Sequence, residues 1–174
     1  MRFLGGVLAS VAFAQNSIAY PEGAPWGSAD PSAAENCASC HYDYEPVFDS
    51  KQLSIDGLPD KVAVGDAYPL TVTFESPDAT VSGFQLLIRS NDMSAGAVDG
   101  NGVATLEIKG SSVRSTSPRK LTDDRVSWTI IWEPASATTP VDLYVAASAA
   151  NDDQSPFGDQ IHYRHYRLTA PHDD

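Results

Sequence analysis

Residues 126–134, VSWTIIWEP, decide the fold class of this 174-residue chain. Val126, Trp128, Ile130 and Trp132 recur at every second position. A strand with one buried face has this period of two, whereas a helix returns its apolar side chains every three or four positions. The stretch therefore predicts a β-strand whose bulky face packs into a core.

Six further runs alternate in the same way, and turn-forming residues separate them. The runs are QLSIDGL (52–58), PLTVTFES (69–76), GFQLLIRS (83–90), ATLEIKG (104–110), VDLYVAASAA (141–150) and QIHYRHYRL (160–168). Asp99-Gly100 and Asn101-Gly102 are typical of tight turns, and VDGNG (98–102) reads as a hairpin turn. The prolines Pro77, Pro118, Pro134 and Pro140 fall between the runs. About seven short strands with such joints predict an all-β, immunoglobulin-like antiparallel β-sandwich over residues 51–170.

The first 19 residues have the pattern of a secretory signal peptide. A short positive start, MR, precedes the apolar run FLGGVLASVAFA, and small-residue cleavage sites end at Ala14 and Ala19. The run is too short to span a bilayer, and no second apolar stretch follows it. We therefore expect an exported protein, periplasmic or extracellular, with no transmembrane segment in the mature chain. Residues 171–174 are expected to form a polar tail.

The charge balance limits the partners. The formal net charge is −12, and the pI is near 4.5. A surface this acidic excludes nucleic acids and anionic membranes as favourable partners, and it attracts proteins with basic patches.

The lead segment, residues 20–50, contains both cysteines of the chain. They stand in Cys37-Ala38-Ser39-Cys40-His41, the C-x-x-C-H pattern of covalent c-type haem attachment. Two thiols about one helical turn apart can add to the two vinyl groups of a porphyrin. The adjacent His41 is then carried to the ring plane as the proximal iron ligand. Export agrees with this interpretation, because c-type haem is attached outside the cytoplasm.

Three other chemistries of the cysteine pair compete with haem: a disulfide, a thioredoxin-like redox motif and a zinc site. A Cys37–Cys40 disulfide is compatible with an oxidising compartment. A thioredoxin-like redox motif needs an α/β context that this chain lacks, and a zinc site needs more ligands than two cysteines supply. Haem c remains the leading interpretation, with a disulfide as its main alternative.

A short helix is expected just before the cysteines. Asp30-Pro31-Ser32 supplies residues that favour a helix start, and Ser32 with Glu35 has the spacing of a capping box. This helix would run directly into Cys37.

The second axial ligand of a haem is left open by the sequence. Met93 lies in the loop SNDMSAG, and His162 and His165 lie on opposite faces of the last predicted strand. Each is a candidate sixth ligand, and an open or water-bound position is the alternative.

Two acidic loops resemble cation sites only superficially. VDGNG lacks the spaced carboxylates of an EF-hand. NDDQSPFGD, residues 151–159, gathers Asp152, Asp153 and Asp159, and we expect a solvated loop there, with a bound cation as the alternative. No motif for nucleophilic catalysis, phosphate binding or zinc-dependent hydrolysis is present, so no catalytic residue is expected.

Four stretches together resemble a known family. They are GAPWGSADPSAAENCASCH, GFQLLIRSNDMSAGAV, VSWTIIWEPA and VDLYVAASAANDDQSPFGDQI, and the resemblance covers roughly residues 24–168. In this respect the chain is similar to the bacterial Reeler-type (reelin-domain-like) sandwich of choice-of-anchor class V proteins. The resemblance implies an immunoglobulin-like fold, an exported location and a cysteine pair or C-x-x-C-H just ahead of the first strand. The chain differs from anchored members in lacking a C-terminal sorting segment, so attachment to a cell surface is not expected.

These observations predict an exported, single-haem, c-type cytochrome-like protein that transfers electrons. Cys37 and Cys40 would hold one covalent haem c, His41 would ligate its iron, and a redox partner with a basic patch would dock on the acidic surface. The protein is not expected to be an enzyme. One alternative is a binding or adhesion module stapled by a Cys37–Cys40 disulfide. Another is a haem-based sensor, or a peroxidase-like site, with an open sixth position.

Overall fold

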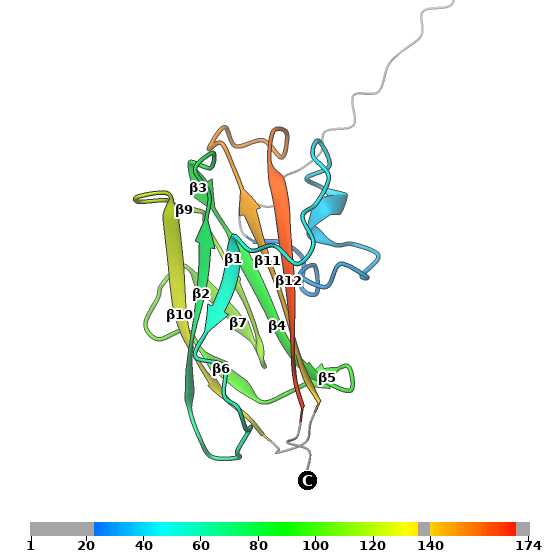
Figure 1. The fold of residues 1–174 in the computed structure, drawn as a ribbon, viewed down its shortest axis with the longest axis vertical. Helices are drawn as coiled ribbons and strands as arrows, with labels where there is room; N and C mark the ends of the chain where they lie inside the picture. The colour runs from blue at the N-terminus through cyan, green and yellow to red at the C-terminus, as the bar shows by residue number, and fades with distance from the viewer. Residues whose placement is uncertain (1–22, 136–139, 170–174) are drawn as a thin grey trace, which may run out of the picture.

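The computed structural model describes residues 23–135 and 140–169 of the chain. The expected signal peptide and polar tail lie outside these residues. The described part folds into two facing β-sheets with a non-regular lead on one side (Figure 1). Its strands are β1 Leu53–Asp56, β2 Tyr68–Glu75, β3 Val81–Ser82, β4 Phe84–Ser90, β5 Met93–Ser94, β6 Ala97–Asp99, β7 Leu106–Lys109, β8 Ser112–Ser115, β9 Arg119–Lys120, β10 Arg125–Glu133, β11 Val141–Ala149 and β12 Gln160–Leu168.

The order of the strands is that of an immunoglobulin-like sandwich. One sheet has the order β1-β2-β10-β6, and the other has the order β12-β11-β4-β8-β7, with β5 paired to β4. The short strands β3 and β9 form a separate pair. Every pairing between these strands is antiparallel. The predicted all-β antiparallel sandwich is therefore confirmed.

The core lies between the two sheets, and the inward faces of β2, β4, β10 and β11 supply most of it, whereas Ile108 of β7 is exposed. On β10 the side chains of Val126, Trp128, Ile130 and Trp132 are all buried, and the two tryptophans are at most 1% exposed. Phe84 of β4 faces Trp128 with ring centroids 4.5 Å apart. Burying a large apolar side chain stabilises a fold by about 1.5–3 kcal/mol, so these inward faces provide the main driving force for folding.

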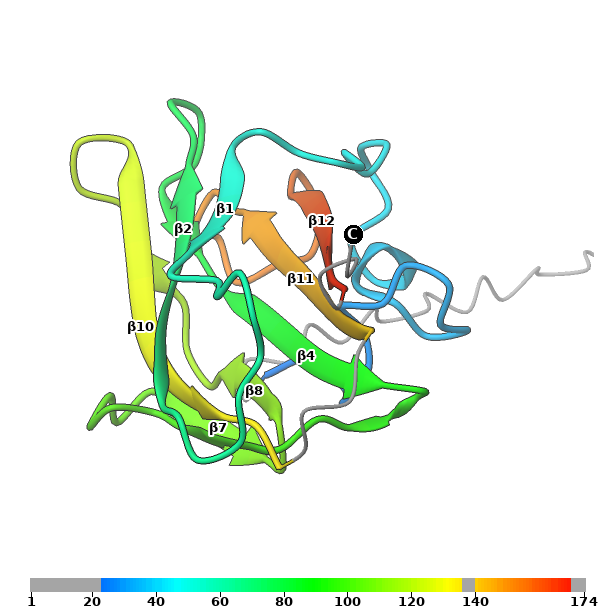
Figure 2. The same ribbon diagram turned by 60° about the horizontal axis from the view of Figure 1, so that its bottom comes forward.

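A second, smaller apolar cluster lies on the outer face of the β12-β11-β4 sheet. Leu87, Ala146, Ile161 and Tyr163 project there, and Ala29 of the lead covers them. Both views of the ribbon place the lead on this side, away from β1, β2 and β10 (Figures 1 and 2). Successive residues of β4 are buried on both faces for this reason, because one face meets the core and the other meets the lead.

The free edge of β12 is covered by the end of the lead. The N–H of Val47 donates to the carbonyl of Ile161 at 2.8 Å, and the N–H of Tyr163 donates to the carbonyl of Val47 at the same distance. Ser50 adds a third backbone hydrogen bond, to the carbonyl of Tyr163 at 3.0 Å. Pairing of this kind protects a sheet edge from association with other chains.

All seven predicted runs form strands, but the short strands between them were not predicted. The clearest omission is β8, which lies between β4 and β7 although only Val113 in it is apolar. The turn at 99–102 forms, with Asn101 and Gly102 at positive φ. It is nevertheless not a hairpin, because it joins β6 of one sheet to β7 of the other.

The short helix of the lead is present as a single 3-10 turn, η1 Cys37–Ser39. It begins after Asn36, not at Ser32, because the Ser32 N–H and hydroxyl both bond to the side chain of Asp30, at 2.9 and 2.6 Å. Across the described ranges, none of the chain forms a helix long and apolar enough to cross a membrane.

Candidate functional site

The turn η1 brings the C-x-x-C-H residues together. The backbone N–H of Cys40 and that of His41 both point back to the carbonyl of Cys37, at 3.4 and 3.3 Å. Asn36 precedes the turn, and its N–H donates to the Ser39 hydroxyl at 3.2 Å. One tight turn therefore separates the two cysteines, and His41 follows directly.

Tyr163 fixes this turn to the sheet. Its hydroxyl accepts a hydrogen bond from the N–H of Ala38 at 3.0 Å and donates one to Asn36 Oδ1 at 3.3 Å. Burial, and next the nearby thiol of Cys37, raise the pKa of Tyr163 well above its ordinary value. The phenol therefore stays protonated and available as a donor over the range in which proteins function.

Gln85 fixes the earlier part of the lead. This side chain is 2% exposed, and its Oε1 accepts hydrogen bonds from the N–H groups of Gly27 and Ala29 at 3.0 and 3.1 Å. Its Nε2 donates to the carbonyls of Ala24 and Pro25 at 3.4 and 2.9 Å. One amide thus satisfies four backbone groups of a segment that has no sheet of its own.

The lead and the sheet enclose a cleft of about 690 Å³. Cys37, Cys40 and His41 line it from the lead, and the loop between β11 and β12 lines it from another side. The sheet side of the wall combines small residues, among them Gly83, Ser115, Ala146 and Ser148, with the larger Phe84, Gln85 and Ile161. The volume lies within the range of ligand and cofactor sites in proteins.

The two thiols differ from the thiolates of a redox motif. Both cysteines are free, and each is partly buried. Burial, and next the proximity of Cys40, raise the pKa of Cys37 to about 12. Cys37 also packs against the outer apolar cluster. A neutral thiol of this kind is a poor nucleophile, which argues against thiol–disulfide exchange at this position.

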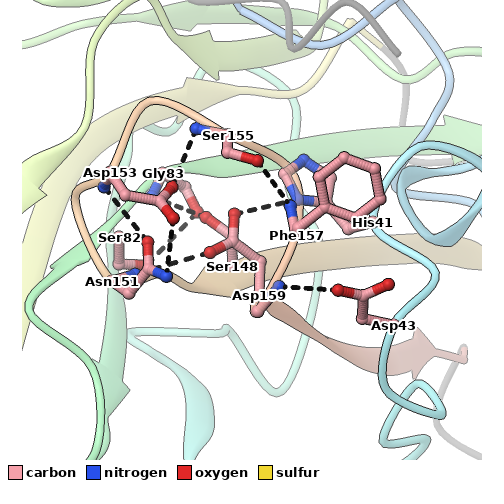
Figure 3. A network of polar contacts seen from close by, with 11 residues as sticks. His41, Asp43, Ser82, Gly83, Ser148, Asn151, Asp153, Ser155, Phe157 and Asp159 are labelled. Atoms are coloured by element: carbon pink, nitrogen blue, oxygen red, sulfur yellow. Dashed lines mark hydrogen bonds and ion pairs between the residues drawn. The ribbon is translucent and has the colours of Figure 1, made fainter. Parts of the chain in front are cut away.

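His41 lies beside a buried carboxylate (Figure 3). Its Nδ1 atom is 3.0 Å from Oδ2 of Asp159, and its side chain is 24% exposed. The Nε2 atom makes no hydrogen bond to any residue that the structure describes, so the nitrogen that would serve as a ligand is free.

The three candidate sixth ligands do not line the cleft. Met93 is 69% exposed on β5. His162 is buried in the interior, where its Nδ1 is 2.9 Å from Ser50 Oγ and its ring meets Phe74 edge-on at 4.9 Å. The third candidate, His165, is on the opposite face of β12, as its position in the sequence predicts, and Asp142 holds its Nε2 at 2.8 Å.

The acidic loop 151–159 is organised by its own hydrogen bonds. Asn151 Nδ2 donates to Asp153 Oδ2 at 3.1 Å, and the N–H of Ser155 donates to Asp153 Oδ1 at 2.9 Å. Among the described residues, no three or more His, Cys, Asp or Glu side chains form a group that could hold a metal ion. The loop is thus a turn held together by its own side-chain hydrogen bonds.

The residues present fit a c-type haem in the chemistry of their donors. Two free thiols, one turn apart, and an imidazole with an uncommitted Nε2 face the same cleft. The sequence indicated these three residues through their spacing alone. It marked Asp159 only as part of an acidic loop, and it gave no sign that Asp159, Tyr163 or Gln85 contacts the motif, because each acts on it from a distant segment.

No family model matches the chain, and no curated protein matches it. Two solved structures of the human F-spondin reeler domain are similar to it, at 18% and 21% identity and TM-scores of 0.49 and 0.47. Each covers 73% of this chain, which in turn covers 93% and 96% of theirs. The bacterial hydrophobin BslA is similar at 11% identity and a TM-score of 0.40, covering 71% of this chain and 92% of its own. Reeler domains belong to the family that the sequence resembles, but at these values membership stays a prediction.

Proposed function

We propose that this chain is an exported, single-haem, c-type cytochrome-like protein that transfers electrons. The observation that carries the proposal is the convergence of Cys37, Cys40 and His41 on one cleft of about 690 Å³. Cys37 and Cys40 would hold the haem by thioether bonds, and His41 would supply the proximal nitrogen. The group would supply one-electron chemistry when bound.

The protein's own residues have three tasks in this proposal. The anchors Tyr163 and Gln85 keep the lead against the sheet, so that the cleft has a fixed shape. The small side chains of Ala146, Ala147 and Ser148 on β11 leave room for a planar ring. The apolar cluster beneath Cys37 excludes water from one side of the turn, which lowers the local dielectric constant around the site.

The acidic surface would select the partner. The chain carries a net charge of −12, and Asp43 and Glu45 are exposed just after His41. A partner with a basic patch would be steered to this region, and the association rate would fall as the ionic strength rises.

Expression with haem-maturation machinery tests the proposal. The purified protein should show a Soret band and a reduced α-band, and its mass should include one haem that denaturation does not release. The Cys37→Ala/Cys40→Ala double variant should lose the covalent haem. Ser39→Ala, within the same turn, is the matched control and should keep it. Colourless protein with an unmodified mass would refute the proposal and favour the binding module.

A second candidate is a haem-based sensor with an open sixth position. It is favoured by one observation, that His41 is the sole His or Met among the described residues lining the cleft. Carbon monoxide should then bind the reduced protein without displacing a protein ligand. A six-coordinate spectrum before the gas is added would instead favour the electron carrier.

A further inference from the structure

A buried carboxylate stands directly behind the imidazole of His41. Asp159 is 3% exposed and lies just before β12. Its Oδ1 accepts a hydrogen bond from the N–H of Asn151 at 3.4 Å, and its Oδ2 is 3.0 Å from His41 Nδ1. Figure 3 shows the Asp159 side chain reaching toward the histidine from the opposite loop.

The Nδ1 atom of His41 needs this partner. It is buried from solvent and makes no hydrogen bond to any described residue, although Asp159 Oδ2 lies only 3.0 Å away. A buried polar atom without a partner is costly, and most such atoms in proteins are satisfied. Asp159 Oδ2, at 3.0 Å, is the acceptor within reach.

Two neighbouring contacts hold residues 41–43 of the lead against residues 157–159 of the loop before β12. The N–H of Gly158 donates to Asp43 Oδ2 at 3.0 Å. The rings of Tyr42 and Phe157 meet edge-on with centroids 5.7 Å apart. Three successive residues from His41 onward are thus each matched to a residue of 157–159. The carboxylate is therefore placed by several contacts that do not depend on the histidine.

We propose that Asp159 is a positioning residue for His41. Its carboxylate accepts the Nδ1 proton, fixes the imidazole as the Nδ1–H tautomer and leaves Nε2 as the donor atom that faces the cleft. The effect of Asp159 on a bound iron rests on the proposed function. A carboxylate acceptor makes an imidazole a stronger electron donor, so it favours the oxidised iron and lowers the reduction potential.

The first test does not require haem. In the haem-free protein, ¹⁵N chemical shifts of the His41 ring should report the Nδ1–H tautomer as the major neutral form. Asp159→Leu, which removes the acceptor, should shift the population toward the Nε2–H tautomer by at least threefold. Asp142→Leu is the control, because Asp142 contacts a different histidine, His165, at its Nε2 atom on the exposed face at 2.8 Å, and its loss should leave the His41 tautomer unchanged. An unchanged His41 tautomer in the Asp159 variant would overturn the proposal.

The second test uses the haem-loaded protein. Asp159→Asn keeps the shape and one oxygen but removes the charge, so it serves even where the Leu variant does not fold. It should favour the reduced iron at least tenfold, which corresponds to 59 mV for a one-electron couple. Asp142→Asn should leave the potential unchanged. An unchanged potential in Asp159→Asn would also overturn the proposal. If no haem is incorporated at all, the proposed function fails, and the tautomer experiment still decides the role of Asp159.

Discussion

The hydroxyl of Tyr163 accepts a hydrogen bond from the backbone N–H of Ala38 at 3.0 Å, across 125 positions of sequence. Ala38 stands between the two cysteines, and Tyr163 stands on the outer face of β12. The chemical motif of the chain is thus fixed by the last strand along the chain. This explains why the thiol of Cys37 is partly buried in the folded protein.

Cys37 should react slowly with alkylating reagents in the folded, haem-free protein. Because its pKa rises from 9.0 to about 12, its thiolate fraction at pH 8 falls from about one in ten to about one in ten thousand. In the protein with both cysteines, peptide mapping by mass spectrometry should show iodoacetamide modifying Cys37 roughly a thousandfold more slowly than in urea. A native rate within tenfold of the rate in urea would contradict the buried thiol.

Replacing Gln85 should release the lead from the sheet. Gln85→Leu leaves the N–H groups of Gly27 and Ala29 without their acceptor, so the amide exchange of both should quicken at least tenfold. The free energy of unfolding should fall by about 1–3 kcal/mol. The exposed Gln52 offers a matched control, and Gln52→Leu should change neither quantity. Equal amide exchange rates of Gly27 and Ala29 in the two variants would show that Gln85 does not hold the lead against the sheet.

The two buried tryptophans of β10 should differ in their tolerance of phenylalanine. Trp132 Nε1 donates to the carbonyl of Ala95 at 2.9 Å, whereas Trp128 Nε1 has no partner among the described residues. Trp132→Phe should therefore destabilise the fold by about 1–2 kcal/mol more than Trp128→Phe, because it leaves a buried carbonyl unpaired. Urea denaturation of the two variants measures the difference, and the reverse order would contradict the hydrogen-bond assignment.

Acid should destabilise the fold through His162. Burial lowers the pKa of His162 from its ordinary value of 6.5, so below pH 6.5 the unfolded chain binds a proton that the folded chain does not. The free energy of unfolding should thus be constant above that pH and fall below it, by at most about 1.4 kcal/mol per pH unit. His162→Gln should flatten this slope, and the exposed His165→Gln should not. Equal slopes in the wild type and His162→Gln would refute the prediction.

Met93 and His165 should have no influence on a bound haem. Neither lines the cleft, and each is exposed. Met93→Leu and His165→Gln should leave the oxidised and reduced spectra and the potential of the haem-loaded protein unchanged. A lost axial ligand in either variant would show that the lead and the sheet rearrange on haem attachment.

The strands of the seven alternating runs were predictable because each run needs only a local pattern. In β10 or β4 the alternation of apolar side chains is set by residues two positions apart, and one buried face is enough to produce it. β8 was not predictable, since its place between β4 and β7 depends on backbone hydrogen bonds that any residue provides. The predicted helix start at Ser32 was wrong for a related reason. The Ser32 hydroxyl, which the capping box required, donates its hydrogen bond to Asp30 instead.

The sequence by itself determined the fold class, through the period of two, and the composition of the motif, through the spacing of Cys37, Cys40 and His41. Only the tertiary structure decided what surrounds that motif. Asp159 reaches His41, and Tyr163 reaches Ala38, because β12 returns beside the lead after more than a hundred residues. Contacts of this range leave no periodic trace in a sequence, since they depend on how the sheets assemble and not on which residues are neighbours in the chain.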